Sequence, residues 1–145
     1  MRRNICWIIV VFMILPVLLA ASHKQAVQAM ERDKLELKDS GFTVTSGITG
    51  VLAEDESVTM ATTLYRGNEY AFQISGDHSV VDIGIYIFDE NGIQLATNFG
   101  RSLKDPLVMS CKQTGTYFIK IKIYKTVDGG QAYYGYAAGY QPVKD

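Results

Sequence analysis

The stretch from Glu69 to Gly92 restricts most strongly what this chain can fold into. Apolar residues alternate with polar or small ones on both sides of a turn at Ser75–Asp77, and a period of two places each set on one face of a strand. The alternating apolar residues are Tyr70, Phe72, Ile74, Val81, Ile83, Ile85 and Ile87. Asn91 and Gly92 favour a tight turn after them, because both residue types tolerate positive φ. The stretch therefore predicts consecutive antiparallel strands.

Further short strands are predicted on both sides of this stretch. They fall at residues 42–50, 57–64, 93–96, 106–112, 116–124 and 132–140, separated by turn and loop residues such as Asp128-Gly129-Gly130. Regularly spaced short strands without alternating helices are typical of sandwiches and jelly rolls. The sequence thus predicts an all-β fold, an antiparallel β-sandwich of seven or eight strands that is jelly-roll-like.

The segment 116–124 shows the two expected strand faces most clearly. One face carries Tyr117, Ile119, Ile121 and Ile123, and the other carries Phe118, Lys120, Lys122 and Tyr124. One face of an antiparallel sheet commonly packs on the core while the other meets solvent. We therefore expect the isoleucines to point inward and the lysines outward.

The N-terminal segment, residues 1–22, is typical of a secretory signal peptide. Arg2 and Arg3 precede an apolar run from Ile5 to Leu19, and Ala20-Ala21-Ser22 suits a signal peptidase. An uncleaved anchor helix is the alternative, but the run contains Pro16 and is shorter than the about 20 apolar residues of a spanning helix. We expect a periplasmic or secreted protein with no membrane span after cleavage.

The rest of the chain divides into three parts. Residues 23–41 form a polar leader rich in helix-forming residues, which could be a short helix at the sandwich edge or a loose segment. Residues 42–141 form the predicted sandwich domain, and residues 142–145 form a polar tail. The 14 basic and 15 acidic residues include no dense basic patch, so we expect no nucleic-acid partner.

Cysteine usage limits the covalent links that the chain can form. Cys6 lies in the signal segment, so Cys111 is the single cysteine expected after cleavage and no internal disulfide can form. Cys111 continues a strand pattern with Leu107 and Met109. We expect it to be a small buried apolar residue, with an intermolecular disulfide as the alternative.

The strand pattern also resembles that of a known family. The segments that carry the likeness are Tyr70-Ala71-Phe72, Gly76-Asp77, Val81–Gly92 and Gly115–Ile121. An aromatic strand, a strand ending in Asp89-Glu90-Asn91-Gly92 and a later Gly-x-Tyr strand are similar to those of the bacterial pre-peptidase C-terminal domain. The likeness extends from about Gly50 to Tyr140. It implies a jelly-roll-like β-sandwich that serves secreted bacterial proteins as a non-catalytic accessory module.

The sequence offers few groups for catalysis. The chain has two histidines, His23 and His78, and His78 falls in a predicted turn. A catalytic triad needs a positioned base, and a zinc site needs three or four suitable ligands. We therefore expect a protein that is not an enzyme and that needs no cofactor.

Calcium is the one metal that we consider. Asp77, Asp82, Asp89 and Glu90 are close in sequence, and clustered carboxylates can supply the oxygen ligands of Ca²⁺. The alternative is that these turn acids are solvated or accept hydrogen bonds from nearby backbone N–H groups.

Tyrosines near the C-terminus are the most suggestive candidates for a binding site. Tyr134, Tyr136 and Tyr140 fall on one side of a predicted strand, with Gly135, Ala137 and Gly139 on the other, and Tyr124 lies on the preceding strand. An exposed tyrosine face could stack on sugars or hold an extended polypeptide. The alternative is that these side chains cap the core.

These features predict an exported, non-catalytic β-sandwich that binds a polypeptide or a glycan in the cell envelope. Two alternatives stay open. The chain could be a structural subunit of an envelope assembly, held through an exposed strand edge. It could also be a small hydrolase or a hydrolase inhibitor.

Overall fold

The computed structural model describes residues 22–100 and 103–143. The predicted signal peptide lies outside the described residues, except for Ser22. Within the described ranges a helix runs over residues 22–39 and is followed by eight strands. The strands are β1 (Thr43–Ala53), β2 (Ser57–Leu64), β3 (Asn68–Gly76), β4 (Val80–Phe88), β5 (Gln94–Thr97), β6 (Leu107–Ser110), β7 (Gly115–Thr126) and β8 (Gln131–Pro142). No helix in these ranges is long and apolar enough to cross a membrane.

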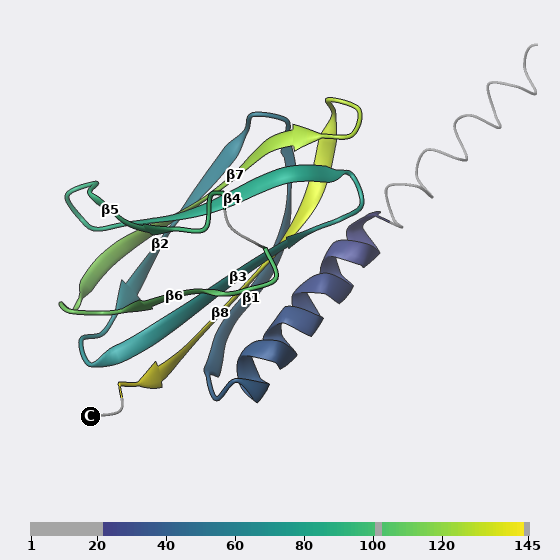
Figure 1. The fold of residues 1–145 in the computed structure, drawn as a ribbon. Coiled ribbons are helices and arrows are strands. Elements are labelled where there is room, and N and C mark those ends of the chain that lie inside the picture. Colours follow the sequence, from purple (N-terminus) through teal and green to yellow (C-terminus); the bar gives the residue numbers. More distant parts are fainter. Residues whose placement is uncertain (1–21, 101–102, 144–145) are drawn as a thin grey trace, which may run out of the picture.

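The strands form two four-stranded sheets that face each other (Figure 1). Sheet A has the order β1-β8-β3-β6, and sheet B has the order β2-β7-β4-β5. All neighbouring strands are antiparallel. In this order β1 pairs with β8, β2 with β7, β3 with β6 and β4 with β5. The strands therefore pair from the two ends of the β region towards its middle. The prediction of an antiparallel β-sandwich is therefore confirmed.

The core lies between the two sheets and follows the alternation in the sequence. The buried residues of β4 and β7 are Ile83, Ile85, Ile87, Tyr117, Ile119, Ile121 and Ile123. Val81 was expected on the same inward face, but it is 54% exposed. The pairing of β4 with β7 is irregular between Val80 and Ile83, and such an irregularity turns side chains to the other face. Cys111 is buried, as predicted.

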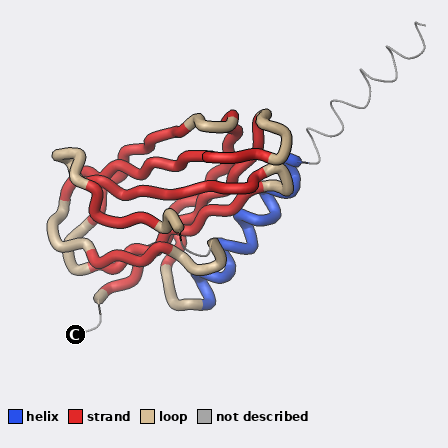
Figure 2. The backbone as a smooth tube through the Cα atoms, turned by 45° about the horizontal axis from the view of Figure 1, so that its top comes forward, coloured by secondary structure: helices blue, strands red, loops and turns tan. Residues whose placement is uncertain are grey.

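The helix packs on the outer face of sheet A, as Figures 1 and 2 show. Its buried residues are Ala26, Met30, Asp33 and Leu37, a spacing that places them on one helix face. Leu37 packs with Phe42 on the chain leading into β1 and with small residues of β3 and β8. The leader is therefore a helix on a sheet face rather than on the sandwich edge. Its stripe is hard to recognise in the sequence because Asp33 belongs to it.

Candidate functional site

The predicted tyrosine face is not an exposed surface. Tyr134 and Tyr136 are 5% and 3% exposed and belong to the core between the sheets. Burial raises the pKa of both phenol groups. Their neighbours Gly135 and Ala137 point to the opposite face, which the helix covers. The small-residue face does pack closely, as its composition suggested, but against the helix, and this leaves the tyrosines pointing into the sandwich.

The other two predicted tyrosines lie apart from each other. Tyr140 is partly buried near the end of β8, and its ring centroid lies 6.1 Å from that of Tyr70. Tyr124 lies on β7 in the other sheet. The structure therefore corrects the prediction that Tyr124 lies beside the other three tyrosines.

The predicted calcium ligands are also separated. Asp77 follows β3, whereas Asp89 and Glu90 follow the far end of β4. The carboxylate of Asp77 accepts hydrogen bonds from the N–H groups of Ser79 (2.8 Å) and Tyr133 (3.2 Å). Asp89 accepts two such bonds within its own turn. Among the described residues, no group of three or more His, Cys, Asp and Glu side chains could hold a metal ion.

An aromatic cluster that the sequence interpretation missed lies on the outer face of sheet B. Tyr86 of β4 and Tyr124 of β7 hydrogen-bond to each other through their hydroxyl groups. The ring centroid of Phe99 lies 6.3 Å from that of Tyr86 and 5.0 Å from that of Tyr124. Phe88 adds a ring 6.4 Å from Tyr86. Burial and the hydrogen bond to Tyr124 raise the pKa of Tyr86.

Gly84 makes room for this cluster. A Cβ atom at Gly84 would lie 3.3 Å from the Tyr86 ring and 3.4 Å from the Tyr124 ring. The two tyrosines therefore reach each other across a position without a side chain. The alternation along β4 shows that Tyr86 and Phe88 share a face, but Phe99 comes from the loop after β5, where no periodic pattern exists.

Lysines border the aromatic rings on the same face. The Nζ atom of Lys122 lies 4.6 Å from the centroid of the Tyr124 ring, and 3.4 Å from Oδ1 of Asp55. Lys120 lies opposite Tyr86 in the pairing of β4 with β7. We call this surface the aromatic–lysine face, defined by Tyr86, Phe88, Phe99, Lys120, Lys122 and Tyr124. No described helix lies over it (Figure 1).

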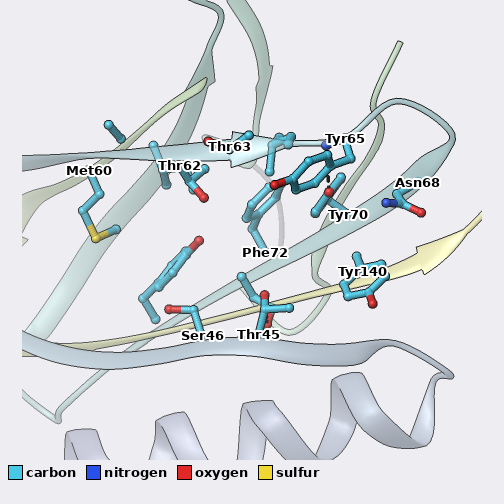
Figure 3. Close-up of a pocket in the computed structure, with 15 residues that line it drawn as sticks. Thr45, Ser46, Met60, Thr62, Thr63, Tyr65, Asn68, Tyr70, Phe72 and Tyr140 are labelled. Atoms are coloured by element: carbon cyan, nitrogen blue, oxygen red, sulfur yellow. Dashed lines mark hydrogen bonds between the residues drawn. The ribbon is translucent and has the colours of Figure 1, made fainter. Parts of the chain in front are cut away.

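A cavity of about 430 Å³ is the second candidate site (Figure 3). It lies between the sheets on the side of the edge strands β1 and β2. Tyr136 and Tyr140 of the predicted set line it, whereas Tyr134 and Tyr124 do not. The sequence gives no direct sign of this cavity, because the cavity depends on the distance between the edge strands β1 and β2, which belong to different sheets.

The comparisons with known proteins place the fold but not the family. No family model matches the chain, and no curated protein matches it. Among solved structures, PliG of Aeromonas hydrophila, a periplasmic inhibitor of g-type lysozyme, is similar with a TM-score of 0.53 at 14% identity, covering 70% of this chain and 90% of PliG. PliG of Salmonella Typhimurium is similar with a TM-score of 0.45 at 12% identity, covering 70% of this chain and 90% of that protein. The resemblance to the pre-peptidase C-terminal domain stays a prediction.

Proposed function

We propose that this protein is an exported, non-catalytic β-sandwich that binds and inhibits a glycoside hydrolase through the aromatic–lysine face. The observation that carries the proposal is the contrast between the two outer sheet faces. The helix covers the middle of the outer face of sheet A, whereas the outer face of sheet B presents aromatic rings, with Phe99 51% exposed. Aromatic residues are enriched in protein interfaces and dominate their binding energy.

The lysines favour a partner with an acidic cleft. Lys120 and Lys122 flank the rings, and positive charge beside an aromatic surface speeds the approach of a negatively charged partner. Glycoside hydrolases commonly carry a pair of carboxyl groups on either side of the bond that they cleave. A lysine-bordered face is complementary to such a cleft. The fold shared with PliG is compatible with this role, and the PliG proteins are inhibitors of a lysozyme.

The test is an inhibition and binding assay with a g-type lysozyme, using the mature protein and a serine protease as the unrelated enzyme. We expect inhibition of the lysozyme alone. Phe99→Ala removes the most exposed ring of the contact surface, and Lys120→Glu reverses a charge that borders the rings. Each should weaken binding by about tenfold or more. Leu35→Ala and Lys38→Glu are matched controls on exposed positions of the helix and should bind as the unchanged protein does.

Three outcomes would contradict parts of the proposal. Absence of both binding and inhibition would reject this enzyme class as the partner. If Phe99→Ala and Lys120→Glu inhibit the lysozyme as well as the unchanged protein does, the contact lies on another surface. Binding to insoluble peptidoglycan, abolished by Phe99→Ala and without inhibition, would assign the same face to a glycan.

We also propose that the protein works in the periplasm or outside the cell. The support is the basic start, the apolar run and the small residues before His23. Mass spectrometry of protein from its native host should find an N-terminus between Ala21 and Lys24. An intact Met1 in the membrane fraction would contradict export of a cleaved form.

A further inference from the structure

The cavity between β1 and β2 opens part of the core to the surface. Thr45 and Ser46 of β1 form one border, and residues 60–64 of β2 form the other. Its interior residues come from the cores of both sheets and include Phe72, Ile119, Tyr136 and Ala138. Both β1 and β2 are edge strands, so no further strand of residues 22–100 and 103–143 closes the sandwich on this side. Ligand pockets typically have volumes of roughly 300–1,000 Å³, and the 430 Å³ of this cavity falls within that range.

The lining determines what kind of molecule the cavity can hold. No charged side chain of the described residues lines it. Burial of an unpaired charge is strongly unfavourable, so ions and zwitterions do not fit. The polar groups of the lining are hydroxyls and one amide, and the remaining lining residues are aliphatic or aromatic. The cavity therefore suits an uncharged and mostly apolar molecule.

Two tyrosine hydroxyls are available as hydrogen-bond donors in this lining. Tyr136 is 3% exposed and lines the cavity, and its hydroxyl makes no hydrogen bond to another described residue. Because this hydroxyl is not one of the fully buried atoms without a partner, it is accessible from the cavity. The hydroxyl of Tyr70 accepts a hydrogen bond from the N–H of Tyr65 (2.9 Å; Figure 3), which leaves its own proton to be donated. A hydroxyl that faces a cavity can donate its proton to a molecule bound there. A ligand with an acceptor oxygen would satisfy both groups.

We propose that this cavity is a binding site for an uncharged, mostly apolar small molecule with a carbonyl or ether oxygen, which the hydroxyls of Tyr136 and Tyr70 orient. The site is separate from the aromatic–lysine face, which lies on the outer side of sheet B. Its test is therefore independent of the inhibitor function proposed above.

The probe for the test is prodan, an uncharged naphthalene with one ketone oxygen, whose emission shifts to shorter wavelength in apolar surroundings. We expect saturable binding of one prodan per chain with a blue-shifted emission. Thr62→Trp should abolish binding, because Thr62 lines the cavity and a larger side chain there fills it. Thr59→Trp is the matched control, since Thr59 is exposed on the same strand and does not line the cavity.

A second pair of variants tests the orienting hydroxyl. Tyr136→Phe removes one donor and should weaken prodan binding by about tenfold, the usual consequence of losing one hydrogen bond. Tyr134→Phe is the matched control, because Tyr134 is equally buried but does not line the cavity. Thermal melts of every variant show which of them fold. If Thr62→Trp does not fold, the comparison of Tyr136→Phe with Tyr134→Phe still tests whether prodan binds in the cavity.

Several results would overturn the proposal. Prodan binding that does not saturate would mean that the probe does not occupy this cavity. Equal prodan binding by Thr59→Trp and by folded Thr62→Trp would mean the same. Equal affinity for the anionic dye 1-anilinonaphthalene-8-sulfonate would contradict the preference for uncharged ligands. Equal affinity of Tyr136→Phe and Tyr134→Phe for prodan would mean that the Tyr136 hydroxyl does not contact the ligand.

Discussion

Met30 of the helix and Gly135 of β8 meet where the helix crosses sheet A. A Cβ atom at Gly135 would lie 2.9 Å from the Cβ atom of Met30 and 3.0 Å from the carbonyl oxygen of Ala26. Real Cβ atoms do not approach other atoms so closely. The helix therefore reaches the sheet at this point because Gly135 has no side chain.

We predict that Gly135→Ala destabilises the protein by about 1–3 kcal/mol, because the added methyl group forces the helix away from the sheet. Urea unfolding followed by circular dichroism measures the change. Gly115→Ala is the control, since Gly115 also lies in a strand but has no atom near the added Cβ. It should change the free energy of unfolding by less than about 0.5 kcal/mol. Equal effects of the two substitutions would contradict the close packing of the helix at Gly135.

The second prediction concerns Asp33, whose carboxyl group is buried between the helix and β3. Its side chain is 1% exposed, and neither its Oδ2 nor the Oγ of Ser75 has a hydrogen-bond partner among the described residues. Burial raises the pKa of the Asp33 carboxyl above its ordinary value of 3.8, and the neighbouring Ser75 and Arg32 oppose this shift only in part.

A raised pKa means that the folded protein holds the proton more tightly than the unfolded chain does. The contribution of Asp33 to stability is therefore greatest below its ordinary, unfolded pKa of 3.8 and is lost as the pH rises through the folded pKa. We expect Asp33→Asn to raise the free energy of unfolding at pH 7 by about 1 kcal/mol and to lose this advantage below about pH 4. Urea unfolding at both pH values measures it, with exposed Glu36→Gln as control. A less stable Asp33→Asn at pH 7 would mean that the ionised carboxylate stabilises the fold.

Tyr134 provides a direct test of the side on which the tyrosines of β8 lie. Because Tyr134 is buried in the core, Tyr134→Ala should lower the free energy of unfolding by about 3–5 kcal/mol. Phe99→Ala removes a half-exposed ring from the aromatic–lysine face and should cost about 1 kcal/mol or less. Thermal melts compare the two variants. If Tyr134→Ala changes the melting temperature only slightly, Tyr134 is exposed, as the sequence pattern suggested.

Asp77 connects the turn after β3 to β8 through its two backbone hydrogen bonds. Asp77→Ala leaves the N–H groups of Ser79 and Tyr133 without this acceptor and should cost about 1–3 kcal/mol. Exposed Asp82→Ala is the control and should be nearly neutral. Because both carboxylate oxygens of Asp77 already accept hydrogen bonds, we expect the melting temperature to be the same with added Ca²⁺ as with EDTA. A clear rise with Ca²⁺ would contradict this role for Asp77.

Local patterns were sufficient to predict much of this protein. The alternation along β7 correctly placed Ile119 and Ile121 inward and Lys120 and Lys122 outward, since the period of two is a property of the strand itself. Turn residues marked the ends of the strands, because positive φ is a local requirement. These signals were enough for the all-β class, for the antiparallel sandwich and for a buried Cys111.

The candidate sites depended on tertiary structure. Alternation shows that Tyr134 and Tyr136 share a face, but not whether that face meets the other sheet or the helix, because both partners come from distant parts of the chain. The aromatic–lysine face needs Phe99, a loop residue, to lie beside β4 and β7. The cavity needs two sheet edges, formed by β1 and β2, to stand apart over the core. Periodicity is read within one strand, whereas each site is formed by side chains whose proximity results from the packing of separate strands.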